Sequence, residues 1–275
     1  MPIPGRAPLA LGPRCLVMGV INVTPDSFSD GGVAIDPVRA RDLAQAMEGA
    51  GADIIDIGAE STRPGARPVG GVEELTRLLP VLKAVAAAVA IPISIDSYKA
   101  DVAIAALDCG ASIVNDISAF AYDPALGPLV AARGTPAILM HTRGRPEDMY
   151  AHASYGDVVK DVRDDLQRAV DRAIGFGVMK ERLIVDPGIG FAKRADQSMA
   201  VLADLPALAD LGLPILVGPS RKSFLTSATG PMAPMERDWP TAAAVTAAVL
   251  GGAHIVRVHN VGKMVPVVKV AEALR

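Results

Sequence analysis

Three polar side chains, each directly after a run of apolar residues, could together bind one ligand. They are Asp96, Asn115 and Asp186. A carboxylate in apolar surroundings is costly unless it is paired with a donor. Helix capping is the alternative explanation for Asp96, as it is for Asp116. If the three converge, they suit a flat ligand with an amidine-like edge, because parallel N–H donors match carboxylate geometry.

A second group lies further along the chain, in Ser220-Arg221-Lys222-Ser223. Lys222 could form a Schiff base with a carbonyl substrate, or it could act as a cationic hydrogen-bond donor. The glycine spacing is wrong for a P-loop. The segment is predicted to begin a helix, whose N–H groups and dipole favour an anion. An ordinary polar loop is the alternative.

Arg257 and His259 stand two residues apart after another apolar run. Strand alternation places them on one face. A lone histidine is more often structural, but this pair indicates an anion clamp. In barrel enzymes, phosphate commonly binds near strands seven and eight.

Two glycine-containing loops near the front of the chain carry further polar groups. One starts at Asn22 and includes Asp30, and the other contains Thr62 and Arg63. Both resemble mobile lids. Asn22 and Asp30 could hold Mg²⁺ against phosphate oxygens, because this ion uses few protein ligands. Capping is the alternative for Asp30.

The elements that must position these groups are short, unbroken apolar runs, which are typical of strands buried on both faces. The predicted strands are Cys15–Ile21, Ile54–Ile57, Ile91–Ile95, Ser112–Val114, Ala137–Met140, Leu183–Val185, Ile215–Val217 and Ile255–Val258. The predicted helices between them are Asp36–Gly49, Val72–Ala90, Lys99–Leu107, Gly156–Phe176, Gln197–Leu211, Thr241–Leu250 and Val261–Leu274.

This alternation predicts parallel strands with right-handed crossovers. We expect a single α/β domain over residues 1–275, a (β/α)8 TIM barrel with its active site at the C-terminal end of the strands. Residues 1–13 would form a short N-terminal extension. A doubly wound open sheet is the competing architecture, but eight regular units favour closure.

Composition excludes several classes of partner. With 27 basic and 30 acidic residues, the net charge of −3 argues against nucleic acid bound by bulk electrostatics.

Cys15 and Cys109 form no CxxC and are expected to be reduced thiols rather than zinc ligands. No signal-peptide pattern is evident, and the uncharged window 239–256 is predicted to be helix, turn and strand. We expect a cytoplasmic protein without a membrane partner.

The ordered set of motifs resembles the dihydropteroate synthase family over residues from about 15 to 275. The motifs are Asn22–Gly32, Glu60–Gly65, Ser94–Asp96, Asn115-Asp116, Asp186–Phe191, Ser220–Ser223 and Arg257–His259. One motif alone would be weak, whereas the whole set in order is specific. The resemblance implies a cytoplasmic dimer with Mg²⁺ as cofactor. It would condense 6-hydroxymethyl-7,8-dihydropterin diphosphate with 4-aminobenzoate and release pyrophosphate in folate biosynthesis.

The resemblance also implies roles for individual residues. The pterin would be held by Asp96, Asn115, Asp186 and Lys222. Arg257 would pack on the ring and bind the diphosphate with Asn22 and His259, while Asp30 assists the metal. Thr62 and Arg63 belong to a loop that orders during turnover. The aminobenzoate pocket, which sulfonamides would occupy, would comprise Phe28, Pro64, Phe191 and Ser223. The residues expected to act in catalysis are Asp96, Asp186, Lys222 and Arg63.

Some positions depart from the family pattern, among them Ala59, Pro219 and Asn260, but none removes a group with an assigned role. Three rival hypotheses remain. They are a pterin-binding methyltransferase barrel, a non-catalytic pterin-binding paralogue, and a lyase that uses Lys222 as a Schiff base.

Overall fold

The computed structural model describes residues 1–24 and 36–275. Its sheet has eight parallel strands in the order β6-β5-β4-β3-β2-β1-β8-β7. The strands are β1 Leu16–Asn22, β2 Ile54–Gly58, β3 Ile93–Asp96, β4 Ile113–Asp116, β5 Ala137–Met140, β6 Leu183–Asp186, β7 Leu216–Val217 and β8 Ile255–Val258. Each predicted strand is present, although most boundaries move by one or two residues.

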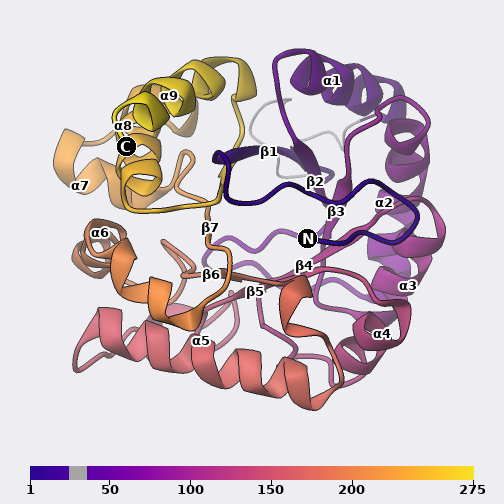
Figure 1. Ribbon diagram of the computed structural model, residues 1–275, viewed down its shortest axis with the longest axis horizontal. Coiled ribbons are helices and arrows are strands. Elements are labelled where there is room, and N and C mark those ends of the chain that lie inside the picture. The colour runs from indigo at the N-terminus through magenta and orange to yellow at the C-terminus, as the bar shows by residue number, and fades with distance from the viewer. Residues whose placement is uncertain (25–35) are drawn as a thin grey trace.

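The two ends of this sheet meet at β6 and β7. There a parallel bridge joins Val185 to Ile215, and the Val185 amide donates to the carbonyl of Pro214 at 2.9 Å. The strands therefore form a nearly closed ring with helices around it (Figure 1). The predicted TIM barrel is confirmed, and the open doubly wound sheet is wrong.

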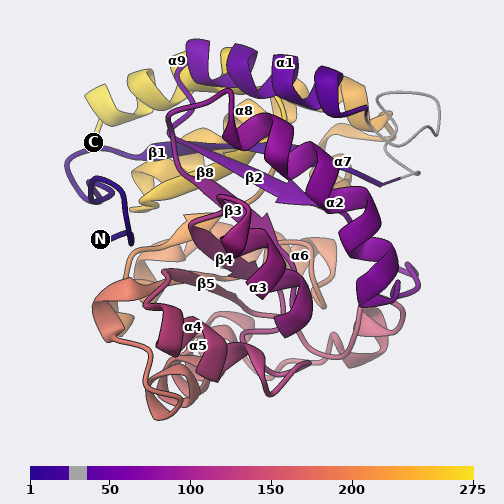
Figure 2. The ribbon, with the colours of Figure 1, turned by 90° about the vertical axis from the view of Figure 1, so that its right-hand side faces the viewer.

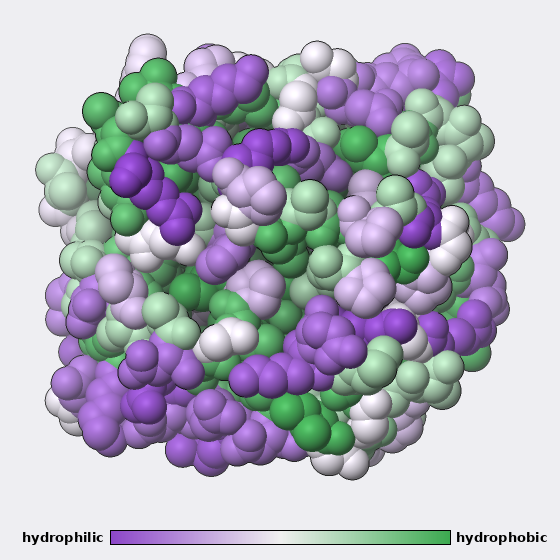
Figure 3. Space-filling model, in the orientation of Figure 1, coloured by the Kyte–Doolittle hydropathy of each residue, from purple (hydrophilic) through white to green (hydrophobic). Residues whose placement is uncertain are grey.

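Helices follow the strands and cover the outside of the ring. They are α1 Pro37–Gly49, α2 Gly71–Ala86, α3 Ala100–Asp108, α4 Leu126–Arg133, α5 Val158–Gly175, α6 Ala195–Ala203, α7 Thr226–Thr229, α8 Asp238–Leu250 and α9 Val261–Ala273. In the space-filling view, the polar face of α5 forms the purple area at the lower left (Figure 3).

Two helices differ from expectation. The sequence did not predict α4, which is short and has Gly127 and Pro128 among its first residues. The predicted helix Gln197–Leu211 is divided, because α6 ends at Ala203 and a 3-10 helix covers Leu205–Leu211. Pro206 explains the division, since it cannot donate the hydrogen bond that would continue α6.

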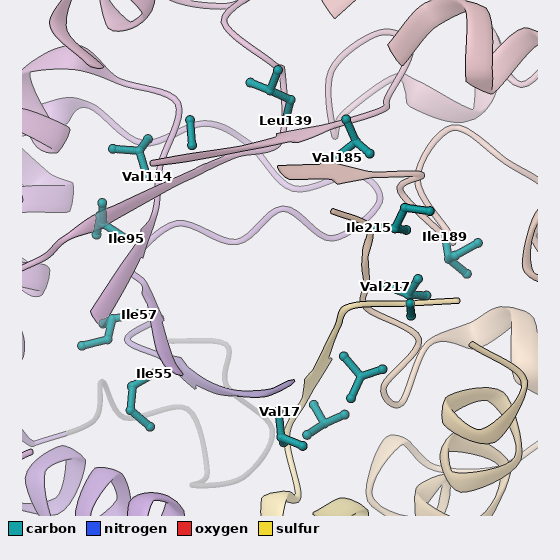
Figure 4. Close-up of a cluster of buried hydrophobic side chains, with 14 of the residues drawn as sticks. Val17, Ile55, Ile57, Ile95, Val114, Leu139, Val185, Ile189, Ile215 and Val217 are labelled. Atoms are coloured by element: carbon teal, nitrogen blue, oxygen red, sulfur yellow. The ribbon is translucent and has the colours of Figure 1, made fainter. Parts of the chain in front are cut away.

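Outward-facing strand residues form the larger core. This cluster includes Ile55, Val114 and Leu139, all fully buried, and its side chains are distributed around the outside of the ring (Figure 4). They pack against the helices, which explains why the strands are apolar on both faces.

A smaller cluster fills the barrel interior at the amino ends of the strands. It combines strand residues such as Ile54 and Ile184 with Ile3 and Leu9 of the N-terminal segment. Figure 2 shows this segment at the left, opposite the arrowhead of β2. The residues before β1 therefore close the amino end and leave the carboxyl end for ligands.

Candidate active site

A cavity of about 760 Å³ lies at the carboxyl end of the barrel. Residues from loops far apart in the sequence line it. The predicted site residues among them are Asn22, Thr62, Arg63, Pro64, Asp96, Phe191, Lys222, Ser223, Arg257 and His259. Phe28 and Asp30, also predicted, lie outside the described residues.

Two predicted residues lie in the buried polar layer beneath the cavity rather than on its lining. Asn115, at the end of β4, donates from Nδ2 to Oδ2 of Asp56 at 3.2 Å. Asp186, at the end of β6, accepts the backbone amide of Gly188 on Oδ1 at 2.7 Å. Their exposed fractions are 5% and 6%. Both keep a small exposed surface at the floor of the cavity.

Arg257 covers part of this floor. Its Nε donates to Oδ2 of Asp56 at 2.7 Å, and its Nη2 donates to Oδ2 of Asp96 at 2.8 Å. The two carboxylates compensate the burial of the guanidinium, as a buried charge requires. The edge of the guanidinium is thereby held against acidic groups of β2 and β3.

Asp56 is a member of this constellation that sequence reasoning missed. It is fully buried in β2, and its Oδ1 has no hydrogen-bond partner within residues 1–24 and 36–275. A signal was present, because a carboxylate inside an apolar strand must be paired with a donor. Strand alternation places Asp56 and Gly58 on one face, and Ile55 and Ile57 on the other.

Burial shifts the pKa values of three side chains at the floor of the cavity, Asp96, Asp186 and Lys222. It raises the pKa of Asp96 to about 7, with Arg257 opposing the shift and Asp56 adding to it. It also raises the pKa of Asp186, against the effect of the Lys222 ammonium. Burial lowers the pKa of Lys222 to about 8, which Asp186 opposes and Arg257 reinforces. Perturbed groups that converge in one cavity are typical of functional sites.

Lys222 joins the floor to the loop after β6. Its Nζ donates to the carbonyl of Ile189 and lies 4.4 Å from the centroid of the Phe191 ring. The amine is thus held as a hydrogen-bond donor beside an aromatic wall.

The side of the cavity that the sequence predicts to bind an anion follows β7 and β8. His259 Nδ1 is 3.0 Å from Oγ of Ser220, and burial together with Arg257 lowers the pKa of His259 to about 3. The imidazole is therefore neutral at physiological pH, and it offers a hydrogen bond rather than a charge. The positive charge comes from arginines that share the lining, Arg63, Arg221 and Arg257.

The helix predicted after Lys222 is brief. Ser223 begins a 3-10 turn over Ser223–Leu225, and α7 then covers only Thr226–Thr229. So short a helix has few aligned peptide dipoles, so the predicted attraction of an anion by a helix dipole at Ser223 is weak.

The loop that carries Thr62 and Arg63 is anchored at its start. Oε1 of Glu60 accepts the Tyr98 hydroxyl at 2.8 Å, and Lys99 bridges Glu60 and the buried Glu74. These contacts tie the loop after β2 to the loop after β3.

The described residues contain no group of three or more His, Cys, Asp or Glu side chains arranged to hold a metal. A cation here would have to rely on few protein ligands and on oxygens of a bound substrate.

Comparison with known proteins identifies the family. The model of the pterin-binding enzyme family matches residues 18–259. A dihydropteroate synthase from Synechocystis is 47% identical, over 99% of this chain and 95% of the relative. The chain belongs to the dihydropteroate synthase family. It is a transferase of folate synthesis, as the motifs predicted.

Solved dihydropteroate synthases have the same fold. A Yersinia pestis enzyme in a sulfonamide drug complex has a TM-score of 0.94 and 39% identity, over 100% of this chain and 98% of that one. A Xanthomonas albilineans enzyme bound to 7,8-dihydropteroate has a TM-score of 0.85 and 37% identity, over 95% and 94% of the two chains. The similarity therefore extends over the length of the barrel.

Proposed function

We propose that this chain condenses 6-hydroxymethyl-7,8-dihydropterin diphosphate with 4-aminobenzoate, giving 7,8-dihydropteroate and pyrophosphate. One observation carries the proposal. A floor of buried acceptors and donors lies beneath a cavity that has an arginine-rich side and an aromatic side. Each part matches one part of the two substrates.

The floor suits the pterin ring. Asp186 and Asp96 accept N–H groups, while Asn115 and Lys222 donate to ring nitrogens or oxygens. Arg257 is positioned to pack on the ring face once the ring reaches the carboxylates below it. Asp56 keeps Asn115 and Arg257 oriented.

The arginine-rich side suits the diphosphate. Arg63 and Arg257 supply positive charge, and neutral His259 donates a hydrogen bond as charge develops on the leaving group. The arylamine nucleophile is uncharged at pH 7, so the reaction needs no strong base. Loss of pyrophosphate leaves a methylene cation that the electron-rich ring stabilises, which favours a dissociative substitution.

We propose Mg²⁺ as the cofactor, held by Asn22 and Asp30. Asn22 ends β1 and lines the cavity, and an amide oxygen is a hard ligand of the kind that Mg²⁺ accepts. When bound, the ion neutralises charge on the departing phosphates. Removal of divalent ions with EDTA should abolish turnover and added Mg²⁺ should restore it, whereas full activity in EDTA would contradict this assignment.

The aromatic side suits aminobenzoate. Phe191, Pro64 and Ser223 line the cavity. Ser223 is proposed to bind the carboxylate, and Phe28 is proposed as a further member of the pocket. Sulfonamides, which mimic aminobenzoate, should then inhibit competitively. A rate unchanged at saturating sulfonamide with limiting aminobenzoate would reject this pocket.

We further propose a cytoplasmic homodimer with a single domain over residues 1–275. Support for the dimer comes from α8 and α9, where Trp239 is 83% exposed and Val270 is 62% exposed. Such apolar side chains mark candidate contact surfaces.

Within the described residues, no helix has both the length and the apolar character needed to cross a bilayer. Light scattering should give twice the chain mass, and Trp239→Arg should give a monomer.

The decisive experiment measures pyrophosphate release from the pterin diphosphate with and without 4-aminobenzoate. Release that depends on aminobenzoate supports the synthase. Binding of pterin without release would favour the non-catalytic alternative. Borohydride trapping of a carbonyl substrate on Lys222 would favour the lyase.

A further inference from the structure

Lys193 is fully buried, with 1% of its surface exposed, and it does not line the cavity. An ammonium in such a place must have all its donors satisfied. Nζ lies 2.8 Å from Nδ1 of His141, and it donates to the carbonyls of Gly188 and Phe191, both at 3.1 Å. Burial lowers the pKa of Lys193 well below its ordinary value, and Asp186 opposes this shift. The three contacts match the three N–H bonds that the protonated side chain offers.

The segment that Lys193 contacts is the loop Pro187–Ala192, which follows Asp186. Lys222 contacts the same loop from the side of the cavity, through the carbonyl of Ile189 and the ring of Phe191. The Tyr155 hydroxyl donates to the carbonyl of Ala192 at 2.8 Å. Side chains from outside the loop therefore satisfy four of its carbonyls, and the two lysines account for three of them.

The backbone of this loop is left-handed at three positions, and one of them is not a glycine. Gly188, Gly190 and Ala192 all have positive φ, of 64°, 81° and 47°. A Cβ at position 188 would lie 2.0 Å from the carbonyl oxygen of His141. Ala192 adopts a left-handed geometry without the freedom of glycine, which costs free energy. The bonds from Lys193 and Lys222 add to those from Asp186 and Ser198, whose side chains accept the amides of Gly188 and Gly190.

His141 connects Lys193 to helix α5. Its Nε2 is 3.0 Å from Oδ2 of Asp165, and the same oxygen accepts Nε of Arg143 at 3.0 Å. A carboxylate at Nε2 favours the tautomer with the proton on Nε2. The lone pair of Nδ1 is then available to accept from the Lys193 ammonium.

We propose that Lys193 is a positioning residue. Anchored through His141 to Asp165, its ammonium fixes the loop Pro187–Ala192 so that Phe191 and Lys222 keep the places that substrate binding requires. The assignment of these contacts to substrates rests on the proposed function, whereas the anchoring itself rests on the distances above.

The first test compares Lys193→Met with the matched control Lys269→Met, which changes an exposed lysine on α9. The thioether side chain fills similar volume without donating. If the aromatic wall moves, KM for 4-aminobenzoate should rise about tenfold or more while kcat falls less than about threefold. The control should change neither parameter. Kinetic constants within twofold of wild type, even with a lower unfolding temperature, would overturn the proposal, because Lys193 would then be only structural.

A second pair of variants covers the case in which Lys193→Met fails to fold. In His141→Asn, the amide oxygen can still accept from Lys193, whereas His141→Leu offers no acceptor. KM should stay near wild type in the first variant and rise in the second. Equal KM values in the two variants would contradict the proposed role of His141 as an acceptor.

The third test needs no substrate. Nitrogen NMR of the wild-type protein should show His141 as a neutral imidazole with the proton on Nε2 and with a hydrogen-bonded Nδ1. A proton on Nδ1 would overturn the anchoring scheme. If the wild-type chain released no pyrophosphate, the proposed function would fail, and the NMR result would still decide this inference.

Discussion

The two ends of the barrel interior are built from the same strands. Residues only two positions apart on one strand lie in different layers, one apolar and one polar. On β6, Ile184 packs into the apolar cluster at the amino end, whereas Asp186 lies in the polar layer beneath the cavity. On β8, Ile255 and Arg257 divide in the same way. Alternation puts each such pair on one face. The first residue of the pair stabilises the fold, and the second belongs to the candidate site.

The apolar end offsets the free energy that is lost by burying polar groups at the other end. Asp56 is fully buried, Asp96 and Arg257 are partly buried, and removing one partner of such a group leaves the others uncompensated. The apolar cluster closed by Ile3 and Leu9 contributes burial without any polar requirement. Substitutions at the two ends should therefore change different measurable quantities.

The largest effect is expected at the carboxyl end, in Asp186→Asn. The amide can still accept the Gly188 N–H, but it loses the charge that would bind the pterin donors. Because a charged hydrogen bond contributes about 1.5–3 kcal/mol, kcat/KM for the pterin diphosphate should fall about 10²-fold. Steady-state pyrophosphate release measures this. The unfolding temperature should not fall, since burial penalises the native carboxylate. A near-wild-type rate would remove Asp186 from the pterin site.

The partner experiment changes Ile184→Ala, two residues earlier on the same strand. Ile184 is fully buried, and truncations of this kind cost about 2–5 kcal/mol of unfolding free energy. Thermal or denaturant unfolding measures the loss. Well below the new midpoint, kcat/KM should stay within about twofold of wild type. A large kinetic defect with little loss of stability would mean that the two ends are not separable.

A smaller, graded effect is expected from pH. The proposed mechanism needs Asp96 ionised and Lys222 protonated. The pKa of Asp96 is raised to about 7, so activity should rise as pH increases through that value. The pKa of Lys222 is lowered to about 8, so activity should fall above it. The profile of kcat/KM should then be a narrow bell, whose two limbs belong to the interacting groups together.

Lys222→Arg sharpens this test, because a guanidinium stays protonated throughout the range. Its alkaline limb should disappear from the profile while the acid limb remains, whatever the absolute rate. An alkaline limb unchanged in this variant would assign that limb to another group.

The sequence predicted the barrel well, because a strand buried on both faces leaves a plain apolar pattern and parallel strands bring their carboxyl ends together. It could not predict which acceptors would lie beneath the lining, since Asn115 is held by Asp56 and Asp186 by the Gly188 amide. Asp56 was overlooked because its neighbours are apolar. Lys193 was overlooked because its contacts to Gly188, Phe191 and His141 come from folding of the loop, and no spacing in the sequence indicates them.

The smallest effect is expected at the closed end, in Ile3→Ala. Ile3 is 5% exposed and belongs to the interior cluster. Since it lies near the chain terminus, where the structure can relax around a truncation, the cost should be about 1–2 kcal/mol, below that of Ile184→Ala. Val38→Ala, at a half-exposed position on α1, is the matched control and should cost less than about 0.5 kcal/mol. Neither variant should change kcat or KM. If Ile3→Ala lowered kcat without lowering stability, the N-terminal segment would have to act on the cavity through the barrel interior, and the division of labour between the two ends would be wrong.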